Sequence, residues 1–410
     1  QAGAGRMPLN LPDGPTTTDG TSLAVRALVL DDGQTRLALV SLTVICLRRE
    51  EADLVRAAVA EAAAVPASHI LIACTHVHSG PWAVYSGEAP VRAELADCLA
   101  RAAAEAARQS LPLRPAALGV ATSHLPGVSR VRRVLRRDGS VITLRRAWPQ
   151  FWGWATDPET VGPEEPLDDL LTVLRVEDAS GTPIAAVAHF TTHPIPDLFG
   201  YAADLVERTH PGVPCLLLNG CQGTVDTPFE VPLCGRTQAG QLPILGDILG
   251  YRVLEQIARA ETSPDVPLGM ASQEVFLPAH PQVLRNAAAR ANTWPRLAAE
   301  GGFHTLLQAL RLGDLALVAI PGEPQVSFGA RLAEASPFPL TRTVGLANDE
   351  CGYMLWPESR ARGGYEADPE GYAVTDEGAL QILLDTAREA VTQLQATGPP
   401  RTSRQVSPFP

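Results

Sequence analysis

The fold is decided by residues 69–81, which read HILIACTHVHSGP. The run 69–74 is short, continuous and apolar, as in a strand that is buried on both faces of a sheet. Two histidines, His76 and His78, follow at once, and Ser79-Gly80-Pro81 then marks a turn. The segment therefore predicts a central buried strand that carries two imidazoles at its end.

Strand and helix patterns alternate on both sides of this segment. Residues 22–30 and 36–47 are rich in β-branched residues and leucine, and the turn sequence Asp31-Asp32-Gly33-Gln34 between them predicts a hairpin. Leucine and alanine at helical spacing predict a helix over 49–64. Such alternation favours an α/β fold with central, mostly mixed β-sheets that are covered by helices. Further helices are expected over 91–109, 244–260, 282–299, 324–335 and 378–394, and further strands over 117–122, 140–144, 170–176, 184–190, 214–218, 268–275, 305–312 and 315–320.

The composition is that of an ordinary soluble globular protein. The chain has 410 residues, of which 45% are hydrophobic and 19% are charged, and this is enough to bury a large core. We predict one catalytic domain over 22–397. An irregular lead-in rich in Gly, Pro and Thr is expected over 1–21, and a flexible tail over 398–410. No apolar stretch approaches the ~20 residues that a membrane-spanning helix needs.

Charge narrows the classes of partner and mechanism. The formal net charge is -12, so the field of the protein repels phosphate backbones, and we expect no nucleic-acid partner. Every basic residue is arginine. The absence of lysine removes Schiff-base chemistry and a phosphate-loop lysine from the mechanisms to consider. A small-molecule substrate is therefore the expected partner.

Cysteine usage bears on the cellular compartment. Seven cysteines form no CxxC pair, and several lie inside apolar runs. An odd number without framework spacing favours a reducing compartment, and hence the cytoplasm. The chain begins at Gln1, so removal of a leader and a secreted or periplasmic location stay as the alternative.

Histidines and one carboxylate follow three of the predicted strands. His76 and His78 follow one apolar run, His193 a second and Glu323 a third. Because the loops beyond the strand ends of an α/β sheet converge on one crevice, these side chains are expected to meet there. Alternation directs the rings of His76 and His78 to the same side. One can then bind a metal while the other acts beside it as acid, base or oxyanion stabiliser.

Each of these residues also has a structural alternative. Buried histidines are common, and a single HxH motif does not by itself establish a metal site. Glu323 stands where a helix is expected to begin at Pro324, and an acidic residue there complements the positive helix end. The recurrence of such residues after three strands favours the metal site.

Four segments carry motifs whose combined order is more specific than any one of them. They are Cys74–Pro81, Phe190–Pro194, Pro321–Glu323 and Leu346–Glu366. Together they resemble the neutral ceramidase family, the zinc amidohydrolases that cleave the N-acyl bond of sphingolipids. The family's corresponding motifs include GTHTHSGP, FAVH and a stretch from NxxxGY to GYE.

The resemblance implies one zinc ion per chain and a set of reacting groups. It places His78 and Tyr353 beside the reacting carbonyl, and it implies that Arg132 holds a polar group of the substrate. The implied zinc ligands are His76, His193, Glu323 and Tyr365.

The sequence also departs from the family pattern. Where the family has QGDVSPN, residues 222–228 read QGTVDTP and lack the serine, so Asp226 or Thr227 is expected to orient the water or the substrate instead. Thr43 stands where the family often carries an aspartate. Because the sequence ends soon after the last motif, the C-terminal immunoglobulin-like domain of larger ceramidases is expected to be absent. These departures predict a substrate other than ceramide.

With this resemblance, the sequence predicts a zinc-dependent amidohydrolase of lipid metabolism, in which a metal-activated water attacks a linear amide carbonyl. A different or smaller acyl substrate than ceramide is expected. One alternative is a zinc-dependent esterase or lactonase with the same metal chemistry. Another, from a different class, is a catalytically silent ligand-binding protein on the same fold.

Overall fold

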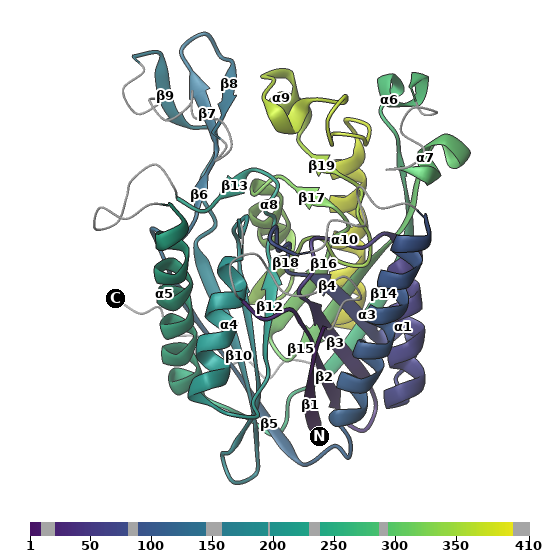
Figure 1. Cartoon of the computed structure of the whole chain (residues 1–410), viewed down its shortest axis with the longest axis vertical. Coiled ribbons are helices and arrows are strands. Elements are labelled where there is room, and N and C mark those ends of the chain that lie inside the picture. The colour runs from purple at the N-terminus through teal and green to yellow at the C-terminus, as the bar shows by residue number, and fades with distance from the viewer. Residues whose placement is uncertain are drawn as a thin grey trace.

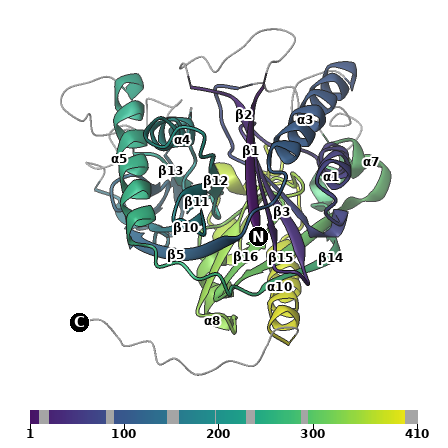
Figure 2. The ribbon, with the colours of Figure 1, turned by 90° about the horizontal axis from the view of Figure 1, so that it is seen from below.

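Three mixed β-sheets form the body of the protein (Figures 1 and 2). The computed structural model describes residues 1–9, 21–80, 89–144, 158–195, 197–228, 238–286 and 294–396. The first sheet has the order β1-β2-β3-β4, the second β12-β11-β10-β5 and the third β14-β15-β16-β18. Their strands are β1 (Ala2–Pro8), β2 (Ala24–Asp31), β3 (Arg36–Leu42), β4 (Ile70–Cys74), β5 (Ala116–His124), β10 (Leu170–Asp178), β11 (Pro183–Phe190), β12 (Cys215–Asn219), β14 (Leu268–Pro278), β15 (Gly302–Leu312), β16 (Leu315–Ala319) and β18 (Leu340–Val344).

Each sheet combines antiparallel pairs with one parallel pair. The parallel pairs are β3 with β4, β11 with β12, and β16 with β18. A helix connects the two strands of each parallel pair, as a parallel connection requires. These helices are α1 (Arg49–Ala63), α4 (Leu198–Thr209) and α8 (Ser327–Ala335), and further helices are α3 (Ala89–Gln109), α5 (Gln238–Arg259) and α10 (Ala379–Ala396). The predicted α/β class with mixed, helix-covered sheets is confirmed.

The continuous apolar run of β4 is explained by burial on both of its faces. Ile70 and Ile72 pack with α1 and α3 on the outer side of the first sheet. Leu71 and Ala73 face a central cluster that also contains leucines and valines of the second and third sheets. The three sheets therefore surround one apolar core, and helices cover their outer faces (Figure 2).

Small sheets cover the end of the molecule that lies uppermost in Figure 1. The two-residue strands β6 (Arg130–Val131) and β13 (Val225–Asp226) pair with each other, as do β17 (Glu323–Pro324) and β19 (Tyr353–Met354). The remaining elements there are β7 (Arg133–Arg136), β8 (Val141–Thr143), β9 (Thr160–Pro163), α6 (Pro281–Arg285), α7 (Pro295–Glu300) and α9 (Pro357–Ala361).

Several predicted elements differ from the structure. The lead-in over 1–21 was expected to be irregular, but Ala2–Pro8 form strand β1, paired in register with β2. The strand expected over 36–47 ends at Leu42. Within the helix expected over 282–299, the described residues include the short helices α6 and α7, and 287–293 lie outside the described residues. The predicted tail, 398–410, lies outside the described residues, and among those described no helix has the length and apolar character to cross a bilayer.

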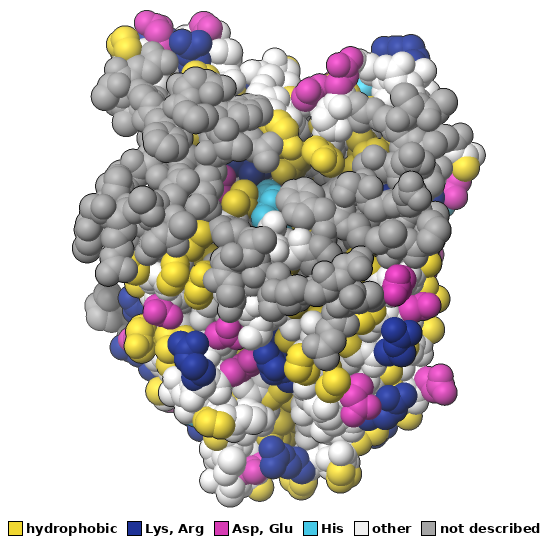
Figure 3. Space-filling model, in the orientation of Figure 1, with side chains coloured by type: hydrophobic (Ala, Val, Ile, Leu, Met, Phe, Trp, Pro, Cys, Tyr) yellow, Lys and Arg dark blue, Asp and Glu magenta, His cyan; other side chains and the backbone are white. Residues whose placement is uncertain are grey.

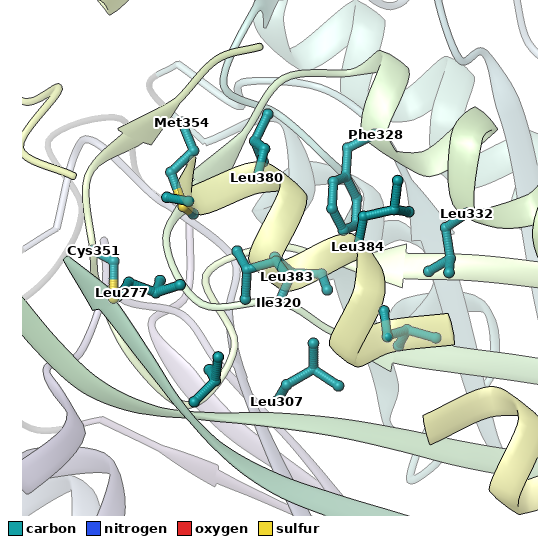
Figure 4. Packing of buried hydrophobic residues seen from close by; sticks show 14 of the residues in the cluster. Leu277, Leu307, Ile320, Phe328, Leu332, Cys351, Met354, Leu380, Leu383 and Leu384 are labelled. Carbon is teal, nitrogen blue, oxygen red and sulfur yellow. The ribbon is translucent and has the colours of Figure 1, made fainter. Parts of the chain in front are cut away.

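The third sheet and its helices enclose an apolar cluster that anchors the loop after β16. Phe328 of α8, Leu384 of α10 and Ile320 pack in this cluster (Figure 4). The ring of Phe328 is fully buried and lies parallel to that of Trp356, with 6.3 Å between the ring centroids. Because Ile320 precedes Glu323 by three residues, this packing fixes the point from which the Glu323 loop starts.

Truncating Phe328 is expected to destabilise the protein. Phe328→Ala leaves a cavity in a closely packed core, and we expect it to lower the free energy of unfolding by about 3–5 kcal/mol. Urea denaturation at equilibrium measures the loss. The control is Leu54→Ala on the exposed face of α1, where 50% of the residue is accessible and a change within about 0.5 kcal/mol is expected. Equal effects of the two substitutions would contradict the packing described here.

Candidate metal centre

The predicted metal residues follow strands of the three parallel pairs. His76 follows β4, His193 follows β11 and Glu323 follows β16. Residues 345 and 346 link β12, β4 and the loop after β16. The Gly345 amide donates to the Asn219 carbonyl of β12 at 3.0 Å, the Cys74 amide of β4 donates to the Leu346 carbonyl at 3.2 Å, and the Leu346 amide donates to the Gly322 carbonyl at 2.9 Å. Each of the three sheets thus contributes one predicted ligand to the same end of the molecule.

Three imidazoles converge at this end. The Nε2 atoms of His76 and His193 lie 2.9 Å apart, and the Nε2 atom of His78 is 3.2 Å from the first and 3.1 Å from the second. Within the described part of the chain, these histidines are the group with the spacing of a metal site. Three nitrogens bound at 2.0–2.1 Å to a tetrahedral ion would lie about 3.3–3.4 Å apart. The spacing of these nitrogens is therefore compatible with a divalent ion such as Zn²⁺ that is bound by two or by all three of them.

The backbone and a neighbouring carbonyl fix His76 in the form that binds metals. His76 has a φ of 68°, in the left-handed region that a residue with a side chain seldom adopts. Its Nδ1 lies 2.7 Å from the Ile45 carbonyl oxygen, to which it donates, so Nε2 keeps its lone pair. Burial lowers the pKa of His76 to about 4, against the opposing effect of the Ile45 hydrogen bond. The ring is therefore neutral at pH 7.

His193 has two neighbours at its other nitrogen. Its Nδ1 lies 3.3 Å from Arg132 Nη1 and 3.4 Å from the Gln222 carbonyl oxygen. Nδ1 can accept a hydrogen bond from Arg132 or donate one to Gln222, depending on the tautomer. Binding of a metal through Nε2 requires the second pattern, because Nε2 then carries no proton.

Glu323 supplies a buried carboxylate next to the imidazoles. Its Oε2 lies 3.5 Å from His76 Nε2 and 3.7 Å from His193 Nδ1. The Glu323 amide donates to the Gly352 carbonyl at 3.0 Å, and Tyr353 is its register partner across β17 and β19. A Cβ atom on Gly223 would lie 2.4 Å from the Glu323 carbonyl oxygen, so the neighbouring loop needs a glycine there.

Burial distinguishes His78 from the other two histidines. His76 and His193 are buried, whereas His78 is half-buried. Figure 3 shows a histidine side chain in a recess near the centre of one face, next to hydrophobic side chains. Of the three rings, His78 is therefore the best placed to meet a substrate that enters from solvent.

The two predicted tyrosines lie side by side. Tyr353 is buried in β19, and its ring centroid is 5.4 Å from Arg132 Cζ. Tyr365 is half-buried at the start of a short 3-10 turn, Tyr365–Ala367, and its ring packs edge-on against Tyr353 at 5.6 Å. This arrangement brings both tyrosines near the predicted site, and the ligand role of Tyr365 stays a prediction.

Arg132 lies behind His193, fully buried within the protein. Besides its contact with His193, the guanidinium donates to Glu366 Oε1 at 2.6 Å and to the Gly223 carbonyl at 2.8 Å. The predicted contact with a polar group of the substrate stays a prediction. In this structure, Arg132 contacts Glu366, Gly223 and His193, and such contacts orient these groups relative to one another.

Asp226 and Thr227, which were predicted to orient the water or the substrate, are also buried. Asp226 belongs to β13, opposite Arg130 of β6, and its Oδ1 accepts the Thr227 amide at 2.9 Å. The predicted role of Asp226 or Thr227 in orienting the water or the substrate is untested by this geometry.

Sequence reasoning missed Glu366, although it ends the quoted segment Leu346–Glu366. The sequence indicated it only indirectly: the arginines in residues 130–133 require a carboxylate as counter-charge, but their sequence does not show which carboxylate that is.

His189 has a structural role. Its Nε2 lies 2.6 Å from the Thr343 carbonyl, and its Nδ1 accepts from Arg342 at 3.3 Å.

Two solved structures share this fold. Neutral ceramidase from Pseudomonas aeruginosa superposes with a TM-score of 0.72 at 18% sequence identity, over 100% of this chain and 76% of that chain. A ceramidase complexed with C2 gives a TM-score of 0.72 at 17% identity, over 100% of this chain and 77% of that chain. No family model and no curated protein sequence matches this chain. At these identities the likeness establishes the fold but not membership of the family.

Proposed function

We propose that this protein is a zinc-dependent hydrolase that cleaves an N-acyl amide bond. The observation that carries the proposal is the convergence of three imidazole nitrogens within 2.9–3.2 Å of one another, beside the buried Glu323 carboxylate. The structural likeness to neutral ceramidases supports the same reaction class by analogy. A different or smaller acyl substrate than ceramide remains part of the proposal.

His76, His193 and Glu323 would hold the ion, with Tyr365 as the fourth proposed ligand. Two imidazole nitrogens and two side-chain oxygens form a donor set that suits Zn²⁺. When bound, Zn²⁺ lowers the pKa of water toward neutrality and polarises a carbonyl group. The Ile45 carbonyl fixes the tautomer of His76 by accepting from Nδ1, and the Gln222 carbonyl would accept from Nδ1 of His193 when Nε2 binds the ion.

His78 and Tyr353 are the proposed reacting groups beside the metal. His78 is half-buried and close to both ligating rings, so it can hold or transfer a proton at the carbonyl oxygen or the leaving amine. Tyr353 is held next to Glu323 and can donate its hydroxyl hydrogen to a developing negative charge. Each such contact is worth about 2–4 kcal/mol when it is aimed at the transition state.

Removal of the metal is the first test. We expect near-stoichiometric zinc in the purified protein, and we expect dialysis against a chelator to lower hydrolysis of N-acyl amides by about 1,000-fold. This loss corresponds to the several kcal/mol that a Lewis-acid ion contributes. Elemental analysis and an amide-cleavage assay, repeated after zinc is added back, measure both quantities.

The assay also separates the rival functions. Matched esters and lactones are tested with the amides, and faster turnover of the esters would replace the amidase by an esterase or lactonase. A protein that binds zinc but turns over none of these compounds would be the ligand-binding alternative. A parent protein without metal, even after zinc is added, would overturn the proposal.

A further inference from the structure

Two adjacent arginines share one buried carboxylate behind the metal centre. The side chains of Arg132, Arg133 and Glu366 have no exposed surface. Glu366 Oε1 accepts from Arg132 Nε at 2.6 Å, while Oε2 accepts from Arg133 Nη1 at 3.1 Å and from Thr143 Oγ1 at 2.7 Å. Both oxygens are therefore bound, and the carboxylate is fixed in place.

Arg132 connects the fixed Glu366 carboxylate to the predicted site. Its Nη1 lies 3.3 Å from His193 Nδ1, its Nη2 donates to the Gly223 carbonyl at 2.8 Å, and its Cζ lies 5.4 Å from the ring centroid of Tyr353. One guanidinium thus touches a proposed ligand, the loop that packs on Glu323, and a proposed reacting group.

The charges explain why a carboxylate is needed there. Arginine is always positively charged, and a buried cation is stable only with a counter-charge. Glu366 is the carboxylate that both guanidiniums contact, so it supplies the counter-charge of Arg132. Arg133 has a second carboxylate, because its Nε donates to Glu164 at 2.5 Å.

We propose that Glu366 is a positioning residue of the metal centre, which neutralises and orients Arg132 so that a divalent ion can bind at His193. The inference rests on the proposed function. Without the Glu366 charge, Arg132 would present an uncompensated positive charge to the ion, and its guanidinium would be free to turn away from the Gly223 carbonyl and the Tyr353 ring.

The test compares Glu366→Gln with Glu164→Gln. Both remove a buried carboxylate from Arg133, but only the first removes the partner of Arg132. We expect Glu366→Gln to lower zinc affinity by about 10- to 100-fold, as for other groups behind metal ligands, and to lower kcat more than it changes KM. We expect Glu164→Gln to lower the thermal midpoint but to keep the zinc affinity of the parent. Competition with a chromogenic chelator measures affinity.

A double variant guards against failure of Glu366→Gln to fold. Arg132→Met combined with Glu366→Gln removes the buried cation together with its counter-charge, a change that is tolerated better than removal of one partner. We expect this variant to fold, to bind zinc nearly as tightly as the parent, and to have a lower kcat.

The outcomes separate the inference from the proposed function. If the parent binds zinc and Glu366→Gln binds it as tightly with an unchanged kcat, the positioning role is wrong while the hydrolase proposal stands. Equal loss of zinc affinity in Glu366→Gln and Glu164→Gln would also overturn it, as would weak zinc binding by the folded double variant. A parent without zinc overturns the proposed function itself.

Discussion

Replacing His76 with alanine is expected to remove the bound metal and to lower turnover by at least about 1,000-fold. Groups behind the ligands typically change metal affinity by about 10- to 100-fold, so loss of a ligand should exceed that range. The ion in turn contributes several kcal/mol to the reaction, and 1.36 kcal/mol corresponds to a factor of ten in rate. Zinc per chain and kcat/KM for an N-acyl amide are the two measurements.

The left-handed backbone of His76 calls for a second substitution. With a φ of 68°, alanine at this position carries a strain of roughly 1–2 kcal/mol, whereas asparagine visits this conformation more readily. His76→Asn should therefore lose zinc without the added strain. His69→Ala, at the opposite end of β4, is the matched histidine control and should keep both zinc and turnover.

Thermal unfolding gives a readout that does not depend on activity. A ligand at 1,000 times its Kd stabilises the folded state by about 4.1 kcal/mol, so zinc should raise the midpoint of the parent and of His69→Ala but not of the His76 variants. Full zinc and full turnover in either His76 variant would show that His76 is not a ligand.

Replacing His78 with glutamine is expected to separate catalysis from metal binding. We expect His78→Gln to keep its zinc while kcat falls by about 100- to 10,000-fold, the range that general acid–base groups contribute. Glutamine retains polarity and similar size but cannot transfer a proton in the same way. Elemental analysis and steady-state kinetics on the same preparation measure both quantities.

The geometry makes this experiment decisive for the role of His78. Its Nε2 is nearly as close to the other two nitrogens as they are to each other. If His78→Gln loses zinc as His76→Ala does, His78 is a third nitrogen ligand and the proposed ligand set is wrong. If zinc and kcat both stay at the level of the parent, His78 has no part in proton transfer.

The parts of the fold that were predictable are those in which local pattern and tertiary packing agree. Residues 70–74 are apolar throughout because β4 is buried on both faces, so its position was clear from the sequence. The meeting of His76, His193 and Glu323 at one end followed from the rule that loops converge beyond the ends of parallel strands. The structure supports that expectation because each residue follows a strand of a parallel pair.

Strand β1 was not predicted, because its glycines are required by a contact with the end of α3, which is distant in the sequence. A Cβ atom on Gly3 would lie 1.8 Å from the Ser110 carbonyl oxygen, and one on Gly5 would lie 2.1 Å from the Ala106 carbonyl oxygen. The strand packs so closely against the end of α3 that only glycine fits. From composition alone, a segment so rich in glycine is predicted to be a loop.

The contacts of Glu366 with Arg132 and Arg133 could not be predicted either, because they join residues that are distant in the sequence. Glu366 and Arg132 are 234 residues apart, and neither has a local pattern that indicates its partner. The positive φ of His76 was also not predicted, because only a few per cent of non-glycine residues adopt such a φ, even though histidine is enriched among them.

If the proposed ligands hold an ion, the contribution of one residue from each sheet makes the centre a cross-link between the three sheets. His76 and His193 are separated by 117 residues, and an ion held between them would close a loop of that length. Because the proposed ligands meet only when all three sheets have come together, metal affinity and folding would be linked. A fragment containing one sheet would bind zinc only as a flexible peptide does, and loss of the ion would loosen the junction of the three sheets first.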